Sequence, residues 1–528
     1  MHFRHVSLLL LAVFCLMSVP RAATPPPQSD NGIQALAEYF DNLASGNLES
    51  AGMRWAGSAQ ERSNRFGINF TGTVLRADCT SPVAQNINEV MPYLKPAAKS
   101  AQRVGSDFVK LEVNNLVDGK QIQWFYYEQY DNGYWWLTYP EDCYAQGWPV
   151  KESKYFRIHV HPDKVQYLNP AVLQEADAFV QRVCDSLKID KSRVAEIASK
   201  KIEYFFCDNT ETLTAITGQT TRGMLDQASN DVLSVDFPHF HEVVHLLVNI
   251  KLKNLPISTL PILREGIATR FGGRWGKRPS ALMDLGAYLY DQKLVMLDSI
   301  LTVSGFSTAA GADIAYPVAG DFCTYLSQRL GPSKFFEFYL KLSGSMEALD
   351  TLSQLNLEQQ FATALAKKTW AEVVSDFEAY LKGAMPQMSV ALAGAADQGT
   401  QLLKENRFEV TRDKDWLNFV FTTDSLSPQG SLVFGKDSRL SGSRSYLWDE
   451  QYGDSLPFDG YRYSVRYDQN EAGLYDYATN ELVAKYIFGI STSQGYYDPG
   501  TGKIRIRFKS SLVGTALPTE TDYRFFAK

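Results

Sequence analysis

The sequence predicts a multidomain α+β protein, because three stretches of the chain carry three different patterns. Residues 31–150 open with a helical pattern and continue with aromatic strands, residues 151–385 are rich in helical patterns, and residues 410–528 consist of short aromatic and β-branched runs separated by Gly, Asp, Asn and Pro. A length of 528 residues with 45% apolar and 21% charged residues suits a globular protein of about three domains. We therefore expect an N-terminal α+β domain, a central domain with a mostly helical lower lobe, and a small all-β C-terminal domain.

The first 23 residues have the pattern of a secretory signal peptide. A short basic start around Arg4 precedes the apolar run from Leu8 to Met17, and Ala22 and Ala23 are the expected cleavage positions. Residues 24–30 then form a Pro-rich linker, and no other stretch is long enough to span a membrane. The sequence predicts a secreted or periplasmic (cell-envelope) protein without a membrane span after cleavage; an uncleaved anchor is the alternative.

Charge and cysteine content narrow the classes of function. A net charge of −7 without a basic patch excludes a typical nucleic-acid or anionic-membrane surface, so soluble partners are expected, and the oligomeric state is not indicated. Beyond the signal peptide the chain has an odd number of cysteines, so at least one thiol is unpaired. The pairings that stay within the predicted domains are Cys79 with Cys143 and Cys184 with Cys207, while Cys323 is expected to be buried.

The N-terminal domain is expected to pack a helix against a sheet. Apolar residues recur three and four apart over residues 33–46, which predicts a helix. Residues 121–139 alternate and contain Asp131-Asn132-Gly133, which predicts a hairpin with a turn of positive φ. This helix followed by aromatic strands resembles the NTF2-like cone fold. We expect the aromatic side chains to pack the sheet; a ligand or sugar pocket is the alternative, and no chemistry is assigned to this domain.

The central domain is expected to begin with two strands and an intervening helix, followed by a helical region. The predicted strands are residues 155–160 and 202–207, and the helix between them runs through residues 176–187. The further predicted helices are residues 281–301, 319–330, 334–342 and 370–381.

Between these strands and helices the chain reads His241-Glu242-Val243-Val244-His245, followed by Glu265 on a second predicted helix. Residues four apart share one helix face, so His241 and His245 can bind one metal ion, with Glu265 as third ligand. Zn²⁺ held in this way keeps a fourth position for water, and Glu242 beside it can accept the proton of that water. Three of the seven histidines lie within residues 239–245, which weakens the alternative of a chance match.

The apolar surroundings of the motif strengthen the prediction of a metal site. Val243, Val244 and residues 246–248 make the helix apolar nearly all round, so we expect it to be buried. Unpaired His and Glu side chains in a buried helix are costly, and a metal ion would satisfy them. Three nearby groups are expected to have other roles. His239 begins the helix, and the alternating His159 and His161 lie on a polar strand face. Arg264 is expected to be solvated; an ion pair with Glu265 is the alternative.

The residues around the motif resemble the gluzincin metallopeptidases, the group that includes thermolysin, and within it the peptidase-MA-like proteins. The resemblance rests on His241-Glu242-Val243-Val244-His245, on Leu263-Arg264-Glu265-Gly266-Ile267-Ala268, and on Tyr316-Pro317-Val318-Ala319-Gly320 running into Thr324-Tyr325-Leu326 and Gly331. It covers about residues 155–385. It implies a zincin-like catalytic domain in which a tyrosine after the glutamate ligand stabilises the oxyanion, a role that falls to Tyr316. A packed core tyrosine is the alternative.

Two departures from the family limit what the resemblance implies. Position 269 is Thr where thermolysin-like enzymes have an Asp that orients a zinc-bound histidine, and Asp313, Asn249 and Asp236 are replacements suggested only by their closeness in sequence. The Gly-x-Met-Glu-Asn strand that captures the substrate amine in zinc aminopeptidases is matched only poorly by Gly223-Met224-Leu225-Asp226-Gln227. Aminopeptidase activity is therefore not implied, and the choice between endopeptidase and exopeptidase stays open.

Taken together, these features predict an exported zinc-dependent metallopeptidase that cleaves a peptide or protein substrate. His241, His245 and Glu265 are the expected Zn²⁺ ligands, and Glu242 and Tyr316 the expected catalytic residues. Two alternatives stay open: a catalytically weak or inactive zincin-fold module that binds a partner in the cell envelope, and a zinc hydrolase of non-peptide bonds. After a linker or helical segment at residues 386–409, the residues from 410 resemble a β-sandwich, whose role the sequence does not indicate.

Overall fold

The computed structural model describes residues 32–71, 97–117, 120–308, 312–384, 400–413, 415–425, 427–442, 460–488, 495–519 and 522–527. The chain folds into two compact units, and each is described by itself. The first is drawn from residues 1–56 and 93–138, and the second from residues 57–92 and 139–528. Residues 57–71, which lie within the expected N-terminal domain, thus belong by their contacts to the second unit. The predicted signal peptide and residues 24–30 lie outside the described residues.

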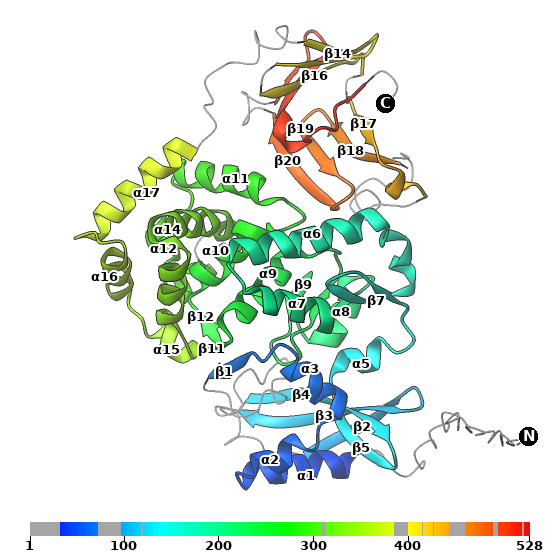
Figure 1. Ribbon diagram of the computed structural model, residues 1–528, viewed down its shortest axis with the longest axis vertical. Helices are drawn as coiled ribbons and strands as arrows, with labels where there is room; N and C mark the ends of the chain where they lie inside the picture. The colour runs from blue at the N-terminus through cyan, green and yellow to red at the C-terminus, as the bar shows by residue number, and fades with distance from the viewer. Residues whose placement is uncertain are drawn as a thin grey trace, which may run out of the picture. The chain divides into compact units, whose positions relative to one another are not determined.

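The first unit packs two helices against a four-stranded antiparallel sheet (Figure 1). The helices are α1 (Ile33–Ala44) and α2 (Leu48–Gly52), and the strands, in their order across the sheet, are β2 (Ala97–Val104), β3 (Phe108–Val117), β4 (Lys120–Asp131) and β5 (Tyr134–Thr138). The buried face of α1 meets the sheet through aromatic rings, with the Phe40 and Tyr126 centroids 5.3 Å apart. The predicted helix and hairpin are both confirmed, and the turn residues Asn132 and Gly133 have φ of 52° and 88°.

The sheet of the second unit has the order β6-β7-β8-β10-β9. Its strands are β6 (Val150–Glu152), β7 (Phe156–Val160), β8 (Ile202–Phe206), β10 (Val232–Ser234) and β9 (Gly223–Leu225). The three central strands are parallel, and the two outer strands pair antiparallel to them. Strands β7 and β8 confirm the two strands predicted for this region. The short strand β9 is an edge strand, and its position becomes important at the functional site.

Helices make up most of the rest of the central part of this unit, as predicted. They are α3 (Gly57–Asn64), α5 (Pro140–Tyr144), α6 (Pro170–Ser186), α7 (Lys191–Lys200), α8 (Thr210–Thr217), α9 (Phe240–Leu252), α10 (Pro261–Gly272), α11 (Pro279–Asp291), α12 (Leu297–Ile300), α13 (Val303–Thr308), α14 (Ala312–Lys341), α15 (Met346–Asp350), α16 (Gln354–Ala364) and α17 (Trp370–Ala384). Short strand pairs join β1 (Asn69–Thr71) to β11 (Asn254–Pro256) and β12 (Ser258–Thr259) to β13 (Ser343–Gly344). One large apolar core runs through the helices, and α9, α10 and α14 lie within it.

One predicted helix differs from the structure. The single helix expected over residues 281–301 is two helices, because the chain leaves α11 after Asp291 and Lys293 adopts a left-handed conformation with φ of 57°. Apolar periodicity continues through this turn, so it does not reveal where the backbone bends. The break expected between residues 330 and 334 is confirmed as a kink in α14, where Gly331 has φ of 74° and Pro332 follows.

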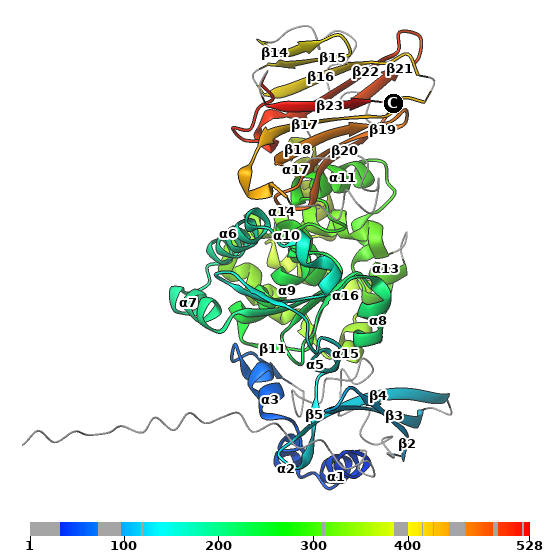
Figure 2. The ribbon, with the colours of Figure 1, turned by 90° about the vertical axis from the view of Figure 1, so that its right-hand side faces the viewer.

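The C-terminal part of the second unit consists of two five-stranded antiparallel sheets (Figure 2). One has the order β14 (Thr400–Glu405), β15 (Phe408–Arg412), β16 (Trp416–Thr422), β22 (Lys503–Lys509) and β21 (Gly495–Asp498). The other has the order β20 (Glu481–Ile487), β19 (Glu471–Asp476), β18 (Tyr461–Tyr467), β17 (Gly430–Lys436) and β23 (Tyr523–Ala527). Side chains from both sheets share one apolar core, as in a sandwich, so the all-β prediction for this region is confirmed.

The predicted disulfide between Cys184 and Cys207 is wrong. Both residues are buried free thiols. Cys184 belongs to the large core on the helix side of β8, whereas Cys207 belongs to a separate apolar cluster with Phe205, so the two side chains are on different faces of the sheet. Cys323 is fully buried, as expected. Cys79, the other partner of the second predicted pair, lies outside the described residues. The described part of the chain contains no helix with the length and apolar character needed to cross a membrane.

A buried carboxylate on β8 predicts a pH-dependent contribution to stability. Glu203 pairs with His159 at 2.7 Å and accepts from Arg157 at 3.1 Å. Although burial opposes ionisation, His159 and Arg65 hold the pKa of Glu203 below its ordinary value. A lowered pKa in the folded state stabilises the fold above the pKa of the unfolded chain, about 4.3, and this contribution is lost as the pH falls through the folded-state pKa.

We therefore expect Glu203→Gln to lower the free energy of unfolding by about 1–3 kcal/mol at pH 7 and by less as the pH falls below about 4, measured by urea denaturation at both values. Glu152→Gln is the matched control, because Glu152 also pairs with Arg157 but is 49% exposed. Equal losses for both variants, or a loss for Glu203→Gln that is independent of pH, would contradict the assignment.

Candidate metal centre

Two helices supply the predicted metal ligands. Helix α9 begins after His239 and carries His241, Glu242 and His245 within its first two turns. Helix α10 begins at Pro261, a residue suited to the first turn because it has no N–H to lose, and carries Glu265. Because His241 and His245 are four residues apart, they lie on the same face of α9, and this face is directed toward α10.

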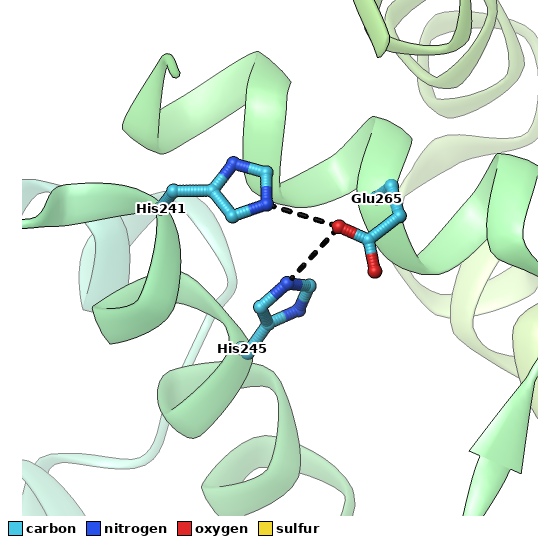
Figure 3. Close-up of side chains that lie close together, drawn as sticks. All are labelled: His241, His245 and Glu265. Carbon is cyan, nitrogen blue, oxygen red and sulfur yellow. Dashed lines mark hydrogen bonds and ion pairs between the residues drawn. The ribbon is translucent and has the colours of Figure 1, made fainter. Parts of the chain in front are cut away.

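The three side chains converge on one point (Figure 3). The Nε2 atoms of His241 and His245 lie 3.0 Å and 3.4 Å from the same oxygen, Oε2 of Glu265, and the three ligand atoms all lie within 4.8 Å of one another. A tetrahedral zinc site with bonds of about 2.1 Å has its ligand atoms about 3.4 Å apart. The two measured separations are close to this value, so the donor set and its spacing fit Zn²⁺.

The electrostatics of the cluster favour the protonation states that a metal ligand needs. Burial opposes the ionisation of Glu265, yet Arg264 and the two histidines hold the pKa of its carboxyl well below the ordinary range. Burial also lowers the pKa of His241, which favours the neutral imidazole. An ionised carboxylate beside a neutral imidazole is the form in which both groups bind zinc.

The expectation that Arg264 is solvated is wrong. Its Nε donates a hydrogen bond to Oε1 of Glu265 at 2.8 Å, although the side chain is 42% exposed. The physical reason is the charge of a buried carboxylate, which the adjacent guanidinium compensates while its outer part stays in water. Oε1 of Glu265 is thus held by Arg264, and Oε2 faces the two histidines.

The orientation of His241 is fixed by a main-chain carbonyl. Its Nδ1 lies 2.8 Å from the carbonyl oxygen of Gly273, which directly follows α10, so Nδ1 carries the proton and Nε2 presents its lone pair to the cluster. Position 269, where the resemblance would place an aspartate with this role, is a buried threonine. Of the suggested replacements, Asp236 pairs with Arg222, Asn249 lines the nearby cavity, and the Asp313 side chain lies outside those described.

Glu242 lies next to the three ligands and contacts the edge strand. Its Oε2 accepts the N–H of Leu225 on β9 at 3.0 Å. Burial raises the pKa of the Glu242 carboxyl, an effect that His241 opposes and Glu265 reinforces. A carboxylate of raised pKa in a fixed orientation is well matched to accepting and then returning a proton.

A cavity of about 610 Å³ opens onto these groups. Its walls include Glu242, His245, Glu265, Tyr316 and the three residues of β9. This volume lies within the range of small-molecule and substrate pockets. The segment from Gly223 to Gln227, a poor match to the amine-capturing strand by its sequence, lies along this cavity. The Asp226 carboxylate there accepts from Ala228 N–H at 2.9 Å and from the Ser229 hydroxyl at 2.8 Å, so it is engaged in its own turn.

Tyr316 lies on the side of the cluster formed by α14. The centroid of its ring is 5.9 Å from that of His241, and burial raises its pKa, so the hydroxyl remains a proton donor at neutral pH. The guanidinium carbon of Arg274 lies 3.6 Å from the centroid of the same ring, and Nη1 of Arg274 lies 3.4 Å from Nε2 of His241. Arg274 was not among the residues predicted from the sequence. Its only signal was its position directly after Gly272-Gly273, where the ligand helix ends.

The loop that carries Gly273 and Arg274 is bound by the C-terminal sandwich. Leu482 of β20 donates its N–H to the Gly276 carbonyl at 2.5 Å and accepts from the Arg278 N–H at 3.3 Å. The Arg278 side chain forms ion pairs with Asp476 and, at 2.9 Å, with Glu481. The sandwich therefore contributes indirectly to the position of the carbonyl that orients His241.

The other histidines have separate partners. His239 occupies the N-cap position of α9 and is half-buried, with Nδ1 2.9 Å from the Ser234 hydroxyl, and it also lines the cavity. His161 lies near Asp163 and Asp208 in a second group whose ligand atoms are within 4.8 Å of one another, but Asp163 is exposed.

Comparisons of the chain with protein families, with curated proteins and with solved structures found no match.

The close contact between α9 and α10 gives a test of the site. A Cβ added at Gly272 would lie 2.6 Å from the main chain of Phe240 and His241, so Gly272→Ala should push α10 away from α9 and separate Glu265 from the histidines. We expect zinc affinity, measured by competition with a fluorescent chelator, to fall about tenfold or more. Gly383→Ala is the control, because nothing lies within 4 Å of its added Cβ. Unchanged affinity in Gly272→Ala would show that this contact does not set the site.

Proposed function

We propose that this chain is an exported zinc-dependent peptidase of the gluzincin type, with a zincin-like central domain and an NTF2-like N-terminal domain. The observation that carries the proposal is the convergence of His241, His245 and Glu265 on one point, with a further carboxylate, Glu242, beside them on a cavity wall. Two imidazoles and one carboxylate are the protein ligands of catalytic zinc in this class of hydrolase.

Zn²⁺, when bound, would act as a Lewis acid that lowers the pKa of water and polarises the scissile carbonyl. Glu242 then serves as the general base, taking a proton from the attacking water and passing it to the leaving nitrogen as the C–N bond breaks. Its hydrogen bond from Leu225 holds one carboxylate oxygen in place. Arg264 compensates the charge of Glu265, which keeps that side chain ionised during this transfer.

Tyr316 is suited to stabilising the negative charge that develops on the carbonyl oxygen. Its ring lies beside His241 and its raised pKa keeps the phenol protonated, so it can donate a hydrogen bond. Stacking with Arg274 on one face limits the movement of the ring.

An edge strand along the cavity favours a peptide as substrate. Strand β9 pairs with β10, and all three of its residues line the cavity. Edge strands can add an extended peptide through main-chain hydrogen bonds. A cleft that combines such an edge with a hydrolytic centre is suited to an extended polypeptide.

The distinct roles of Glu242 and the ligands give the decisive comparison. We expect purified wild-type protein to contain about one zinc per chain and Glu242→Gln to retain it while losing at least about 10³-fold in peptide hydrolysis, because only the proton transfer is removed. His245→Ala should lose both metal and activity. The measurements are zinc content by elemental analysis and cleavage of a proteome-derived peptide library, with products identified by mass spectrometry.

The outcomes separate the alternatives. Equal metal loss in Glu242→Gln and His245→Ala would contradict the separation of roles. Zinc in the wild type with no cleavage that depends on Glu242 would instead indicate a binding module or a hydrolase of other bonds.

A further inference from the structure

The charge of Arg274 has no role in the peptidase mechanism above, which uses only its stacking on Tyr316. It lies in the loop between α10 and α11 and lines the cavity together with Glu242 and Tyr316. Its guanidinium carbon is 3.6 Å from the Tyr316 ring centroid, and Nη1 is 3.4 Å from Nε2 of His241, the ligand atom that faces Glu265. Arg274 therefore brings a fixed positive charge to the metal ligands themselves.

A cation held by His241 and a guanidinium beside the same nitrogen repel each other, since both are positive. A negatively charged group that contacts both would remove this repulsion. The donors of a guanidinium lie in its own plane, and their spacing matches the two oxygens of a carboxylate. The position of the guanidinium over the Tyr316 ring restrains that plane at the cavity wall.

Two other arginines line the cavity. Arg264 donates to Glu265 at 2.8 Å, and Arg222 pairs with Asp236 at 2.8 Å. The carboxylates of the cavity outside the metal cluster also have partners: Glu141 pairs with Arg62, and Asp226 accepts hydrogen bonds within its own turn. Arg274 differs from the other two arginines in its position, because it lies both beside the ligand atom of His241 and over the ring of Tyr316.

We propose that Arg274 is a specificity-determining residue that binds a carboxylate of the substrate next to the bond that is cut. The inference rests on the proposed function for its reaction, but the binding of a carboxylate can be measured without turnover. The carboxylate comes from one of two sources, an acidic side chain or the free C-terminus of a peptide. The substrate class is therefore an anionic peptide with its charge near the scissile bond.

The test uses the full-length, zinc-loaded protein and two small probes of nearly the same shape. Succinate has two carboxylates, and succinamate replaces one of them with a neutral amide. We expect calorimetric titration to show succinate binding at least about tenfold more tightly than succinamate to the wild type, because a charge-assisted pair replaces a neutral one. In Arg274→Gln the two affinities should agree within about threefold.

Arg222→Gln is the matched control, because it removes an arginine of the same cavity that is paired with Asp236, and it should keep the preference for succinate. Equal binding of both probes to the wild type, or a preference that persists in Arg274→Gln, would overturn the proposal. Slower hydrolysis by Arg274→Gln without any change in probe preference would assign Arg274 to the transition state alone and would also overturn it.

Two further titrations identify the source of the carboxylate, using zinc-loaded Glu242→Gln to prevent cleavage. One compares acetyl-trialanine with its C-terminal amide, and the other compares acetyl-Ala-Glu-Ala-amide with acetyl-Ala-Gln-Ala-amide. The charged member of at least one pair should bind about tenfold more tightly, and Arg274→Gln in the same background should abolish the difference. No difference in either pair would contradict the substrate class.

These results are distinguishable from failure of the proposed function. If the protein takes up no zinc, the peptidase proposal is wrong. The succinate and succinamate titrations on metal-free protein then test Arg274 alone, and succinate should again bind more tightly than succinamate. The protein could instead bind zinc and prefer succinate through Arg274 but cleave no peptide. That result would support the carboxylate site at Arg274 and contradict the proposed peptide hydrolysis.

Discussion

The site depends on the close packing of one helix, α10, between two others. A Cβ at Gly266 would lie 2.5 Å from the Ala319 carbonyl oxygen of α14, and a Cβ at Gly272 would lie 2.6 Å from the main chain at the start of α9. Glycine at both positions lets α10 approach both neighbours at main-chain contact distance. Glu265, directly before the first of these glycines, is thereby held in a fixed position facing His241 and His245. The ligand geometry is a consequence of helix packing within a large buried core.

Burial makes the balance of charge at the site as important as its geometry. Glu265 and Glu242 are both buried, and isolated carboxylates would be costly there. Arg264 compensates the charge of Glu265 through a hydrogen bond. The Leu225 N–H compensates part of the charge of Glu242 in the same way. The pKa values reflect these surroundings. The pKa of Glu265 is lowered, which favours the ionised form that binds metal. The pKa of Glu242 is raised, which suits a group that accepts and returns a proton. Two glutamates of the same type thus receive different roles from their surroundings.

Local patterns in the sequence predicted what depends on local structure. The spacing of His241 and His245, the strands of the sandwich and the hairpin at Asn132-Gly133 follow from helical or alternating periodicity. Contacts between segments that are distant in sequence were not predicted: the Gly273 carbonyl at His241, the Leu225 amide at Glu242, and the position of Arg274. Each depends on how loops and an edge strand are placed by tertiary packing, which has no periodic signal. The disulfide predicted between Cys184 and Cys207 was wrong for the same reason, because the face of the sheet on which each cysteine lies is also set by tertiary packing.

The sandwich binds the loop that orients His241. The metal centre therefore depends on contacts made by residues as far apart in the sequence as Leu225 and Leu482.

The central claim is that this centre binds zinc through two imidazoles and one carboxylate. X-ray absorption at the zinc edge of the purified protein tests it most directly. The account predicts about four light-atom ligands at about 2.0–2.1 Å with the outer-shell scattering of two imidazoles. A spectrum with sulfur ligands, or one without imidazole scattering, would contradict it.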